Sequence, residues 1–490
     1  GLNVASQARR QGLQVAVVDQ GPAGGTCLNH GCVPSKMLIY PADAVRSLQD
    51  ARAVGVHASI DEIDFGRIMS CMRGVVNETR TDLEKSLRSK ERLTYFQQRA
   101  AFVSNYTLEL SGGAGQAGGE GGSSDRSDGS GRTISAPKIV LATGARPLVP
   151  PIPGLEEAGF LDNSSLLQIQ RLPASLVIIG GGYIGCEFGH FFSAMGADVV
   201  MIGRGPQLLK GEDPEAAGLV QRLLAQYMRV ITEHEVISVE VGKDGRKIVN
   251  ARNVRDGKVS RFEAEQILLA AGRRSNSDLL HPERGGIETD RHGWIIVDEY
   301  LQTSKKGVYA LGDAIGKHMF RHTANYEAEV VAHNLLRAAG DSEREAADYH
   351  AVPYAVFTHP QVAGVGMKEH EALAEGRKVL IGRAGYMDTA MGVAMSAEHA
   401  FVKVVLEEES GRILGATAVG PMAAELVQQV VYLMNTDYQD MMPVIRSQVI
   451  HPTINEVLVR AFSELSHPVR RTQRNEPKGE IVRKTIKGKK

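Results

Sequence analysis

The chain has 490 residues, of which 43% are hydrophobic and 23% are charged, and its formal net charge is -1. This length predicts about two to four domains, and the composition is that of a globular protein rather than a fibrous or disordered one. A charge so close to zero excludes the basic surface that nucleic acid requires. No apolar run reaches the roughly 20 residues of a membrane-spanning helix, and no signal-peptide pattern is present. We therefore expect a cytoplasmic protein that binds neither nucleic acid nor membranes.

The beginning of the chain has the pattern of a dinucleotide-binding unit. In "GLNVASQARRQGLQVAVVDQ" a glycine precedes a helix-like segment, and the apolar strand 15–18 ends in Asp19. The interval from Gly1 to Asp19 equals that from Gly185 to Gly203 in a second such unit. We expect Gly1 to be the last glycine of a fingerprint whose first strand and first two glycines are absent from this sequence. Asp19 would then bind the ribose of an adenine dinucleotide.

The next segment, "GGTCLNHGCVPSK", contains two of the four cysteines of the chain, Cys27 and Cys32. So few cysteines do not form a disulfide scaffold, and a close pair is more typical of a redox or metal site. Even with His30 the pair has too few ligands for a four-ligand zinc site, so a metal would need a ligand from elsewhere. A spacing of five along a helix can bring two sulfurs within bridging distance, which favours a redox disulfide.

Two later strands end in similar Ala-x-Gly turns. They are "KIVLATGARP", which contains Thr143 and Gly144, and "QILLAAGRRSN", which contains Gly272. We expect the chain to cross from one nucleotide-binding domain to the other at these turns. Residues 112–131, rich in glycine and serine, predict a flexible surface insertion between two short strands.

A complete dinucleotide fingerprint lies in "SLVIIGGGYIGCEFGHFFSAMGADVVMIGR". The apolar strand 176–179 leads into Gly180, Gly182 and Gly185, and a helix-like segment follows, as the G-x-G-x-x-G pattern requires. The glycines permit a tight turn and the close approach of a pyrophosphate to the N-terminal end of the helix.

The end of the next strand predicts which nicotinamide nucleotide is bound. An NAD site has an acidic residue about 20 residues after the glycines, whereas an arginine there accommodates the 2'-phosphate of NADP. This chain has Gly203 and Arg204 at that point and Lys210 further along the loop. With two cations and no carboxylate in this stretch, we predict NADPH rather than NADH. The alternative is that Arg204 is a solvated loop charge.

The cysteine segment resembles the active-site sequence of the flavin-dependent disulfide oxidoreductases. The resemblance extends from Gly1 to about Leu465, and "GVYALGDAIG", "HTANYEAEVVAHN", "VPYAVFTHPQVAGVG" and "HPTINE" resemble further family motifs in the family's order. It implies an α/β fold with two doubly wound dinucleotide-binding domains, one for FAD and one for NADP, and an α+β C-terminal dimerisation domain. It also implies FAD and NADPH as cofactors, with NADH possible, a homodimer, and a small-molecule disulfide or dithiol as substrate.

The resemblance implies domain boundaries as well. The expected parts are an FAD-binding domain at 1–148 and 274–346, an NAD(P)-binding domain at 149–273, an interface domain at 347–466 and a basic tail at 467–490. The stretch "VRRTQRNEPKGEIVRKTIKGKK" has nine Lys and Arg against two Glu and predicts a solvated, disordered extension.

The resemblance assigns the electron path to four residues. Cys32, as the sulfur nearest the flavin, would form the charge-transfer thiolate, and Cys27 would be the interchange thiol that attacks the substrate. His451, supplied by the other subunit, would be the acid/base, and Glu456 would orient its ring. An imidazolium near a thiol lowers the thiol pKa, and the thiolate is the nucleophile.

Other matching positions would hold the cofactors. Lys36 and Glu187 match an ion pair near the flavin N5 edge, and Tyr183 matches an aromatic that covers the flavin until nicotinamide displaces it. Asp313 would bind the ribityl chain. The remaining cofactor-binding positions are Gly1, Asp19, Gly25, Thr26, Thr143, Gly144, Gly180, Gly182, Gly185, Arg204, Lys210, Gly272 and Gly312. No metal is expected.

Within the family, the chain resembles mycothione reductases over several stretches. Dihydrolipoamide dehydrogenases share the cysteine string and the "HPT" ending, but they usually carry an acid where Gly203 stands. Mercuric reductases need a C-terminal cysteine pair for Hg(II), and no cysteine follows Cys186. We predict an NAD(P)H:disulfide oxidoreductase (EC 1.8.1.-) acting on a mycothione-like or bis-γ-glutamylcystine-like disulfide. The alternatives are an NAD-linked dihydrolipoamide dehydrogenase and, if the chain cannot hold FAD, a non-catalytic dimeric binding module.

Overall fold

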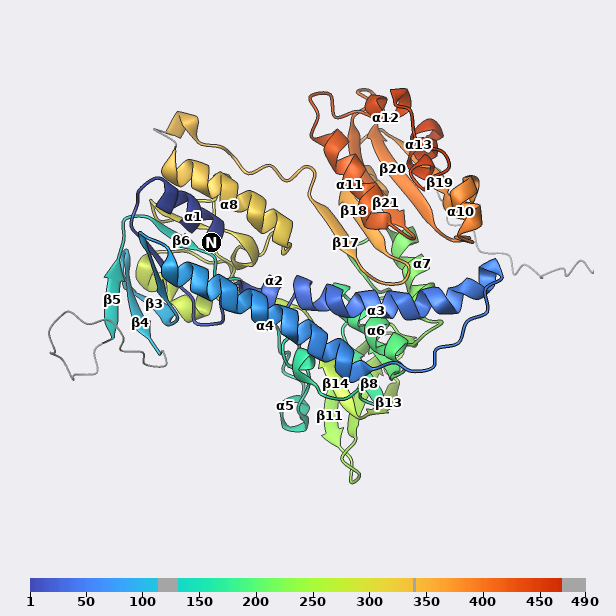
Figure 1. The fold of residues 1–490 in the computed structure, drawn as a ribbon, viewed down its shortest axis with the longest axis horizontal. Helices are drawn as coiled ribbons and strands as arrows, with labels where there is room; N and C mark the ends of the chain where they lie inside the picture. Colours follow the sequence, from blue (N-terminus) through green and yellow to red (C-terminus); the bar gives the residue numbers. More distant parts are fainter. Residues whose placement is uncertain (113–130, 338–340, 469–490) are drawn as a thin grey trace, which may run out of the picture.

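The computed structural model describes residues 1–112, 131–337 and 341–468. Figure 1 shows three lobes beside two long helices, α3 (Cys32–Asp50) and α4 (Phe65–Ser89). The predicted glycine/serine insertion and the predicted basic tail fall almost wholly outside the described residues. One lobe combines the N-terminal segment with α8 (Arg321–Leu336), so two distant parts of the chain build it together.

The lobe around residues 175–269 contains a parallel sheet with the strand order β10-β9-β8-β14. All residues of its central strand β8 are buried, as expected for a strand covered on both faces. Helices cover one face and a three-stranded antiparallel sheet covers the other. The elements are β8 (Ser175–Ile179), α6 (Tyr183–Met195), β9 (Asp198–Ile202), α7 (Pro214–Leu224), β10 (Arg229–Ile231), β11 (His234–Val241), β12 (Lys247–Asn253), β13 (Val259–Ala264) and β14 (Gln266–Leu269).

The N-terminal lobe repeats this plan with one difference. Its parallel strands form two separate pairs, β1 with β2 and β6 with β16. In the other lobe β8 lies between β9 and β14, whereas no strand of the described residues joins β1 to β6. This is the arrangement expected if Gly1 corresponds to Gly185. The elements are α1 (Leu2–Arg10), β1 (Val15–Val18), α2 (Gly25–Asn29), β2 (Leu93–Phe96), β3 (Arg99–Ser104), β4 (Thr107–Ser111), β5 (Arg132–Ser135), β6 (Ile139–Leu141) and β16 (Val308–Ala310).

The C-terminal lobe is a six-stranded antiparallel sheet with the order β17-β18-β21-β20-β19-β22. Helices α11 and α13 pack on it and bury a second large apolar core. The lobes also contain four short helices: α5 (Leu155–Ala158), α9 (Glu369–Ala374), α10 (Ala390–Ala394) and α12 (Met442–Arg446). The remaining elements of this lobe are β17 (Pro353–Val356), β18 (Val362–Gly366), β19 (Val379–Gly385), β20 (Phe401–Glu407), β21 (Ile413–Val419), α11 (Ala423–Met434), α13 (Glu456–Ser463) and β22 (Leu465–Ser466).

One apolar core joins the helix that begins at Cys32 to the nucleotide-binding sheet of residues 175–269. Buried side chains of α3, α4 and α6, among them Leu38, Met69 and Phe191, belong to a single cluster. Burying such side chains stabilises the fold by about 1.5–3 kcal/mol each. The cysteine segment is therefore fixed against the sheet that carries the complete glycine fingerprint.

Candidate active site

The two cysteines lie on either side of a helix break. Cys27 is in α2 and Cys32 is the first residue of α3, so the predicted placement of both on one helix is wrong. The break is at Gly31, where an added Cβ would lie 3.0 Å from the carbonyl oxygen of Thr26. The amide of Asn29 donates to two carbonyl oxygens at 3.0 Å and stabilises the turn. The break brings the thiols together by a change of direction rather than by helical periodicity.

Cys27 and Cys32 both have free side chains. Hydrogen bonding from the Cys32 side chain is the main cause that lowers the pKa of Cys27 to about 6, and the Arg321 guanidinium lowers it further. The same interaction raises the pKa of Cys32, while the charge of Lys36 opposes that rise. A lowered pKa favours the Cys27 thiolate, which is the nucleophilic form of a cysteine.

Lys36 and Glu187 form an ion pair that joins α3 to α6. The Lys36 Nζ lies 2.8 Å from both carboxylate oxygens, and Glu187 is 7% exposed. The backbone N–H of Phe357 donates to the same carboxylate at 3.1 Å, and the Lys36 ammonium lies 4.6 Å from the Phe357 ring centroid. Contact with both carboxylate oxygens fixes the geometry of the pair, although only Glu187 is buried and the Lys36 side chain is 37% exposed. It lies one helical turn beyond Cys32.

The glycine fingerprint forms the turn between β8 and α6. Gly180 has φ +123°, and a Cβ there would lie 2.2 Å from the carbonyl oxygen of Ala270. A Cβ on Gly185 would lie 2.1 Å from the carbonyl oxygen of Gly180. Gly182 is the N-cap of α6, which begins at Tyr183. Backbone this close at a helix N-terminus fits a pyrophosphate, because N–H groups can reach it without side-chain obstruction.

The loop after β9 exposes the predicted phosphate-binding cations. Arg204 and Lys210 are both exposed, and Arg204 Nη1 lies 3.7 Å from Glu235 Oε1. Arg252 Nη2 lies 3.6 Å from the other oxygen of Glu235. The sequence prediction that no carboxylate is available in this stretch does not hold in three dimensions, because β11 begins beside Gly203 and brings Glu235 to the loop.

The first nucleotide lobe contains polar atoms with few partners. Asp19 accepts one backbone hydrogen bond at 3.0 Å, and burial raises its pKa. Burial also raises the pKa of Asp313, whose nearest cation is Arg273 at 3.6 Å. The Thr143 hydroxyl is buried without a hydrogen-bond partner among the described residues. Buried polar groups are normally satisfied, so these atoms fit a polar ligand such as the ribose and ribityl hydroxyls of FAD.

The remaining predicted FAD positions lie at the ends of short elements. Gly1 is the N-cap of α1, and a Cβ there would lie 3.1 Å from the Cβ of Ala142, just beyond β6. Gly312 has φ +68° and follows β16, the partner strand of β6. Gly25 and Thr26 open α2. Gly1 and Gly312 therefore lie at the same edge of this sheet, where a dinucleotide binds in such folds.

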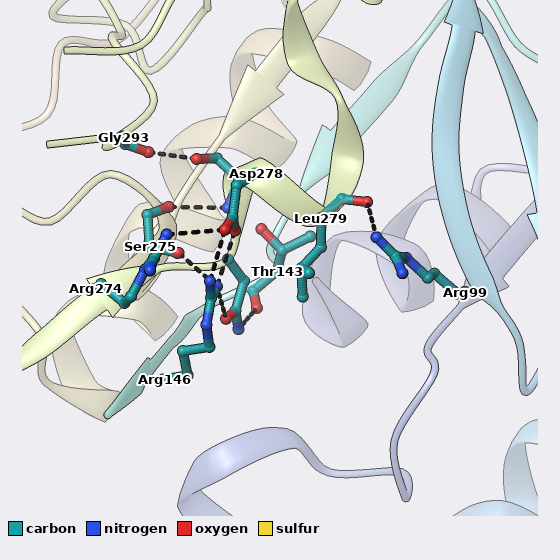
Figure 2. Close-up of polar contacts among 10 residues, drawn as sticks. Arg99, Thr143, Arg146, Arg274, Ser275, Asp278, Leu279 and Gly293 are labelled. Atoms are coloured by element: carbon teal, nitrogen blue, oxygen red, sulfur yellow. Dashed lines mark hydrogen bonds and ion pairs between the residues drawn. The ribbon is translucent and has the colours of Figure 1, made fainter. Parts of the chain in front are cut away.

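The crossing between the two nucleotide lobes is a two-stranded ladder, β7 (Ala145–Pro147) with β15 (Arg273–Ser275). The turns before these strands contain Gly144 at φ +67° and Gly272 at φ +123°. Figure 2 shows Arg146 reaching across to Asp278, with two hydrogen bonds of 2.8 and 2.6 Å. Arg274 binds the same carboxylate at 2.9 Å. The ladder is the predicted crossing, and its ion pairs fix the two strands together.

His451 and Glu456 form the predicted pair at the start of α13. The His451 Nδ1 lies 2.9 Å from Glu456 Oε1, and the His451 side chain is 71% exposed. The hydrogen bond from His451 lowers the pKa of Glu456. This bond leaves the Nε2 of His451 directed away from its carboxylate, so that nitrogen can exchange a proton with a substrate.

Two family models match the chain. The model of the pyridine nucleotide-disulphide oxidoreductases matches residues 1–328, and that of their dimerisation domain matches residues 352–462. The chain belongs to this family. It is therefore an oxidoreductase of the flavoprotein disulfide reductase type, with two dinucleotide-binding domains followed by a dimerisation domain.

Similar proteins carry several specific names. The chain is 33% identical over 450 residues to a mycothione reductase of Mycobacterium tuberculosis (strain ATCC 25618 / H37Rv), covering 92% of this chain and 94% of that relative. It is 32% identical over 478 residues to a dihydrolipoyl dehydrogenase of Halobacterium salinarum, covering 96% and 95%. Among solved structures, the HOCl-induced flavoprotein disulfide reductase RclA from Escherichia coli matches with a TM-score of 0.78 and 27% identity, covering 94% of this chain and 96% of that one.

Family members depend on FAD and use NAD(P)H. No group of three or more His, Cys, Asp or Glu side chains that could hold a metal ion occurs among the described residues. Of the helices in the described ranges, none is both long and apolar enough to span a membrane.

Three residues near the site were not identified from the sequence. Arg321 reaches Cys27 from the start of α8, and Glu235 reaches Arg204 from β11. Glu212 accepts a hydrogen bond from the Tyr183 hydroxyl and is 1% exposed, and burial raises the pKa of its carboxyl. Only Glu212 could have been noticed in the sequence, as an acid beside the helix-capping Asp213.

Proposed function

We propose that the protein reduces a small disulfide with electrons from NADPH, through FAD and the Cys27–Cys32 pair. The observation that carries this proposal is the placement of Cys27 and Cys32 on either side of the break at Gly31, where the Cys32 side chain lowers the pKa of Cys27. A pair with one ionised sulfur near neutral pH can both attack a disulfide and be reoxidised.

FAD, when bound, supplies the transfer of two electrons from the nicotinamide to the cysteine pair. We expect the polar groups of Asp19, Thr143 and Asp313 to bind it, and the fingerprint at 180–185 to bind the pyrophosphate of NADPH. Lys36, held by Glu187, places a fixed positive charge one turn from Cys32. That charge opposes the rise in the pKa of Cys32 that its interaction with Cys27 causes.

The reduced cysteine pair would reduce the substrate disulfide in two exchange steps. The Cys27 thiolate attacks one sulfur of the substrate disulfide and forms a mixed disulfide, and the other substrate sulfur leaves as a thiolate. His451 protonates that leaving thiolate. As the Cys32 sulfur attacks Cys27 and forms the Cys27–Cys32 disulfide, its proton passes to His451, which returns it to the second substrate sulfur so that this sulfur leaves as a thiol. Glu456 keeps the Nδ1 of His451 hydrogen-bonded, so the Nε2 carries the proton that is transferred.

The active unit that we propose is a homodimer. His451 is 71% exposed in the single chain, and the dimerisation-domain match ends just after it, at residue 462. A partner subunit would bring its own His451 to the thiols of this chain. We place the domain boundaries at 148, 273 and 346, and the reaction in the cytoplasm, where thiols are kept reduced.

The similarity to mycothione reductase and the loop cations support a low-molecular-weight disulfide as substrate. A second candidate is an NAD-linked dihydrolipoamide dehydrogenase, favoured by one observation. Glu235 lies 3.7 Å from Arg204 and adds a carboxylate near the expected ribose site. Such a carboxylate would repel a 2'-phosphate and could accept hydrogen bonds from a ribose.

A substrate panel tests the proposal. One preparation is assayed with mycothione, bis-γ-glutamylcystine, glutathione disulfide and lipoamide, each with NADPH and with NADH. We expect the highest kcat/KM with NADPH and with mycothione or bis-γ-glutamylcystine. Highest activity with lipoamide and the NAD couple would establish the second candidate instead. No oxidation of either nucleotide by an FAD-loaded protein would contradict both.

A further inference from the structure

Tyr183 is enclosed by aromatic rings from two other parts of the chain. It is the first residue of α6, in the lobe of the complete fingerprint. Its ring centroid lies 6.2 Å from that of Phe320, which precedes α8, and 6.2 Å from that of Tyr354 in β17. The interplanar angles are 25° and 27°, so each of these two rings is stacked with the Tyr183 ring. Tyr183 therefore lies where the three lobes meet.

The hydroxyl of Tyr183 is tied to a buried carboxylate. It donates to Glu212 Oε1, and Glu212 is 1% exposed. The other oxygen, Oε2, has no hydrogen bond of acceptable geometry among the described residues, although the Tyr354 hydroxyl lies near enough to lower the pKa of the Glu212 carboxyl. If Tyr183 moved away, the buried Glu212 carboxylate would lose the hydrogen bond from the Tyr183 hydroxyl, which is costly.

The backbone around Glu212 is fixed, so the carboxylate cannot follow Tyr183. The N–H of Leu209 donates to the carbonyl oxygen of Gly181 at 2.8 Å, and the N–H of Glu212 donates to that of Leu209 at 2.8 Å. The next residue, Asp213, caps α7 and lies 3.1 Å from the buried Lys403 ammonium. The loop is thereby anchored to the fingerprint, to a helix and to the C-terminal sheet.

We infer that Glu212 is a positioning residue that holds Tyr183 in the closed position and opposes its displacement by the nicotinamide ring. This inference rests on the proposed function and on the role that the family resemblance implies for Tyr183, a ring that covers the flavin until nicotinamide displaces it. Entry of the ring breaks the Tyr183–Glu212 hydrogen bond, whereas binding of the adenosine half at the fingerprint leaves it intact. Glu212 thus weakens the nicotinamide contribution to binding and leaves the adenosine contribution unchanged.

Two probes separate these contributions without any turnover. Calorimetry gives the Kd of NADP⁺, which carries the nicotinamide, and of 2',5'-ADP, which lacks it. Glu212→Leu removes the acceptor, and Tyr183→Phe removes only the donor hydroxyl and keeps the ring. We expect each substitution to lower the Kd of NADP⁺ by about threefold or more, which corresponds to one net hydrogen bond. The Kd of 2',5'-ADP should change by less than about twofold. The double variant should bind NADP⁺ no more tightly than the tighter single variant.

Glu212→Gln is the matched control. Its amide oxygen can still accept from Tyr183, so its NADP⁺ affinity should stay closer to that of the unmodified protein. The inference would be overturned if the Kd values of both probes changed equally or if neither changed. It would also be overturned if the effects of the two substitutions on the Kd of NADP⁺ were additive in the double variant. Binding of 2',5'-ADP shows that each variant is folded. An unmodified protein that binds neither probe would contradict the proposed function itself, and the inference with it.

Discussion

At the scale of single residues, the chemistry depends on a proton shared by two thiols. The bond from Cys32 to Cys27 is internal to the pair, so its effect does not require the partner subunit. Arg321 adds a positive charge beside Cys27. The reduced pair should therefore be a nucleophile at pH values where an ordinary cysteine, with a pKa of about 8.5, is mostly protonated.

Alkylation of the reduced protein tests whether Cys27 is a thiolate near neutral pH. Because iodoacetamide reacts with the thiolate, the rate at Cys27 should rise with pH to a midpoint near 6 and fall about tenfold per pH unit below it. The measurement is mass spectrometry in a Cys71→Ser background, since Cys71 is an exposed cysteine. Cys32→Ala removes the side-chain donor and should move the midpoint upward, whereas Cys32→Ser keeps a hydroxyl that can still donate to Cys27. A midpoint near 8.5 in the parent protein would exclude the shared proton.

The His451–Glu456 pair gives a second prediction for single residues. His451→Ala should slow turnover by about 10²-fold or more, because it removes a positioned acid/base. Glu456→Gln keeps the shape of the side chain and an oxygen that can accept from the Nδ1 of His451, but it removes the negative charge. Its turnover should therefore fall less than that of His451→Ala. Steady-state kinetics with a saturating disulfide measures both. Nearly normal turnover of His451→Ala would show that another group transfers the proton.

At the scale of elements, the loop after β9 decides which nucleotide binds. It presents Arg204 and Lys210 to solvent, while β11 brings Glu235 to within 3.7 Å of the Arg204 guanidinium. The two guanidiniums of Arg204 and Arg252 share that one carboxylate. Exposed pairs of this kind are worth about 0–1 kcal/mol, so a phosphate can displace Glu235.

Substitutions of Arg204 and of Glu235 should change the KM for NADPH in opposite directions. Arg204→Ala should raise the KM for NADPH at least several-fold, since a charged hydrogen bond is worth about 1.5–3 kcal/mol, and should leave the KM for NADH almost unchanged. Glu235→Gln removes the competing carboxylate and should lower the KM for NADPH. Both follow from initial rates with each nucleotide. An unmodified enzyme that prefers NADH would contradict the assignment and favour the dihydrolipoamide dehydrogenase function.

At the scale of the whole molecule, a buried ion cluster joins the nucleotide-binding sheet to the C-terminal sheet. Lys403 of β20 lies 3.1 Å from Asp213 and 2.9 Å from Glu215, both at the start of α7, and 3.3 Å from Glu369. Lys403 is 6% exposed and Asp213 is 2% exposed. The same cluster anchors the loop that carries Glu212.

Removing the cation of this cluster should destabilise the protein. Lys403→Met leaves Asp213 buried without its cation, and we expect the free energy of unfolding to fall by about 3–5 kcal/mol. Urea unfolding followed by circular dichroism measures the loss. Lys378→Gln is the control, because Lys378 and Glu409 are 73% and 79% exposed and such a pair contributes little. Equal stability of the two variants would show that the cluster does not hold the lobes together.

The sequence predicted those parts of the molecule that local patterns encode. The fingerprint at 180–185 and the strands 15–18 and 176–179 have local patterns, and all appear in the structure. The Lys36–Glu187 contact spans 151 positions and was expected from family resemblance alone. The break at Gly31 was missed although a glycine between the cysteines indicates it. Glu235 could not be predicted, because only the pairing of β11 beside Gly203 brings it to Arg204.

The most direct test of the central claim is an anaerobic titration of the FAD-loaded protein with NADPH, followed by absorbance. The account predicts that the first two electrons enter the cysteine pair and produce a long-wavelength charge-transfer band from the Cys32 thiolate. This band should persist in Cys27→Ser and be absent in Cys32→Ser, while neither variant reduces a disulfide. Survival of the band in Cys32→Ser, or disulfide reduction by either variant, would contradict the assignment of electron transfer to this pair.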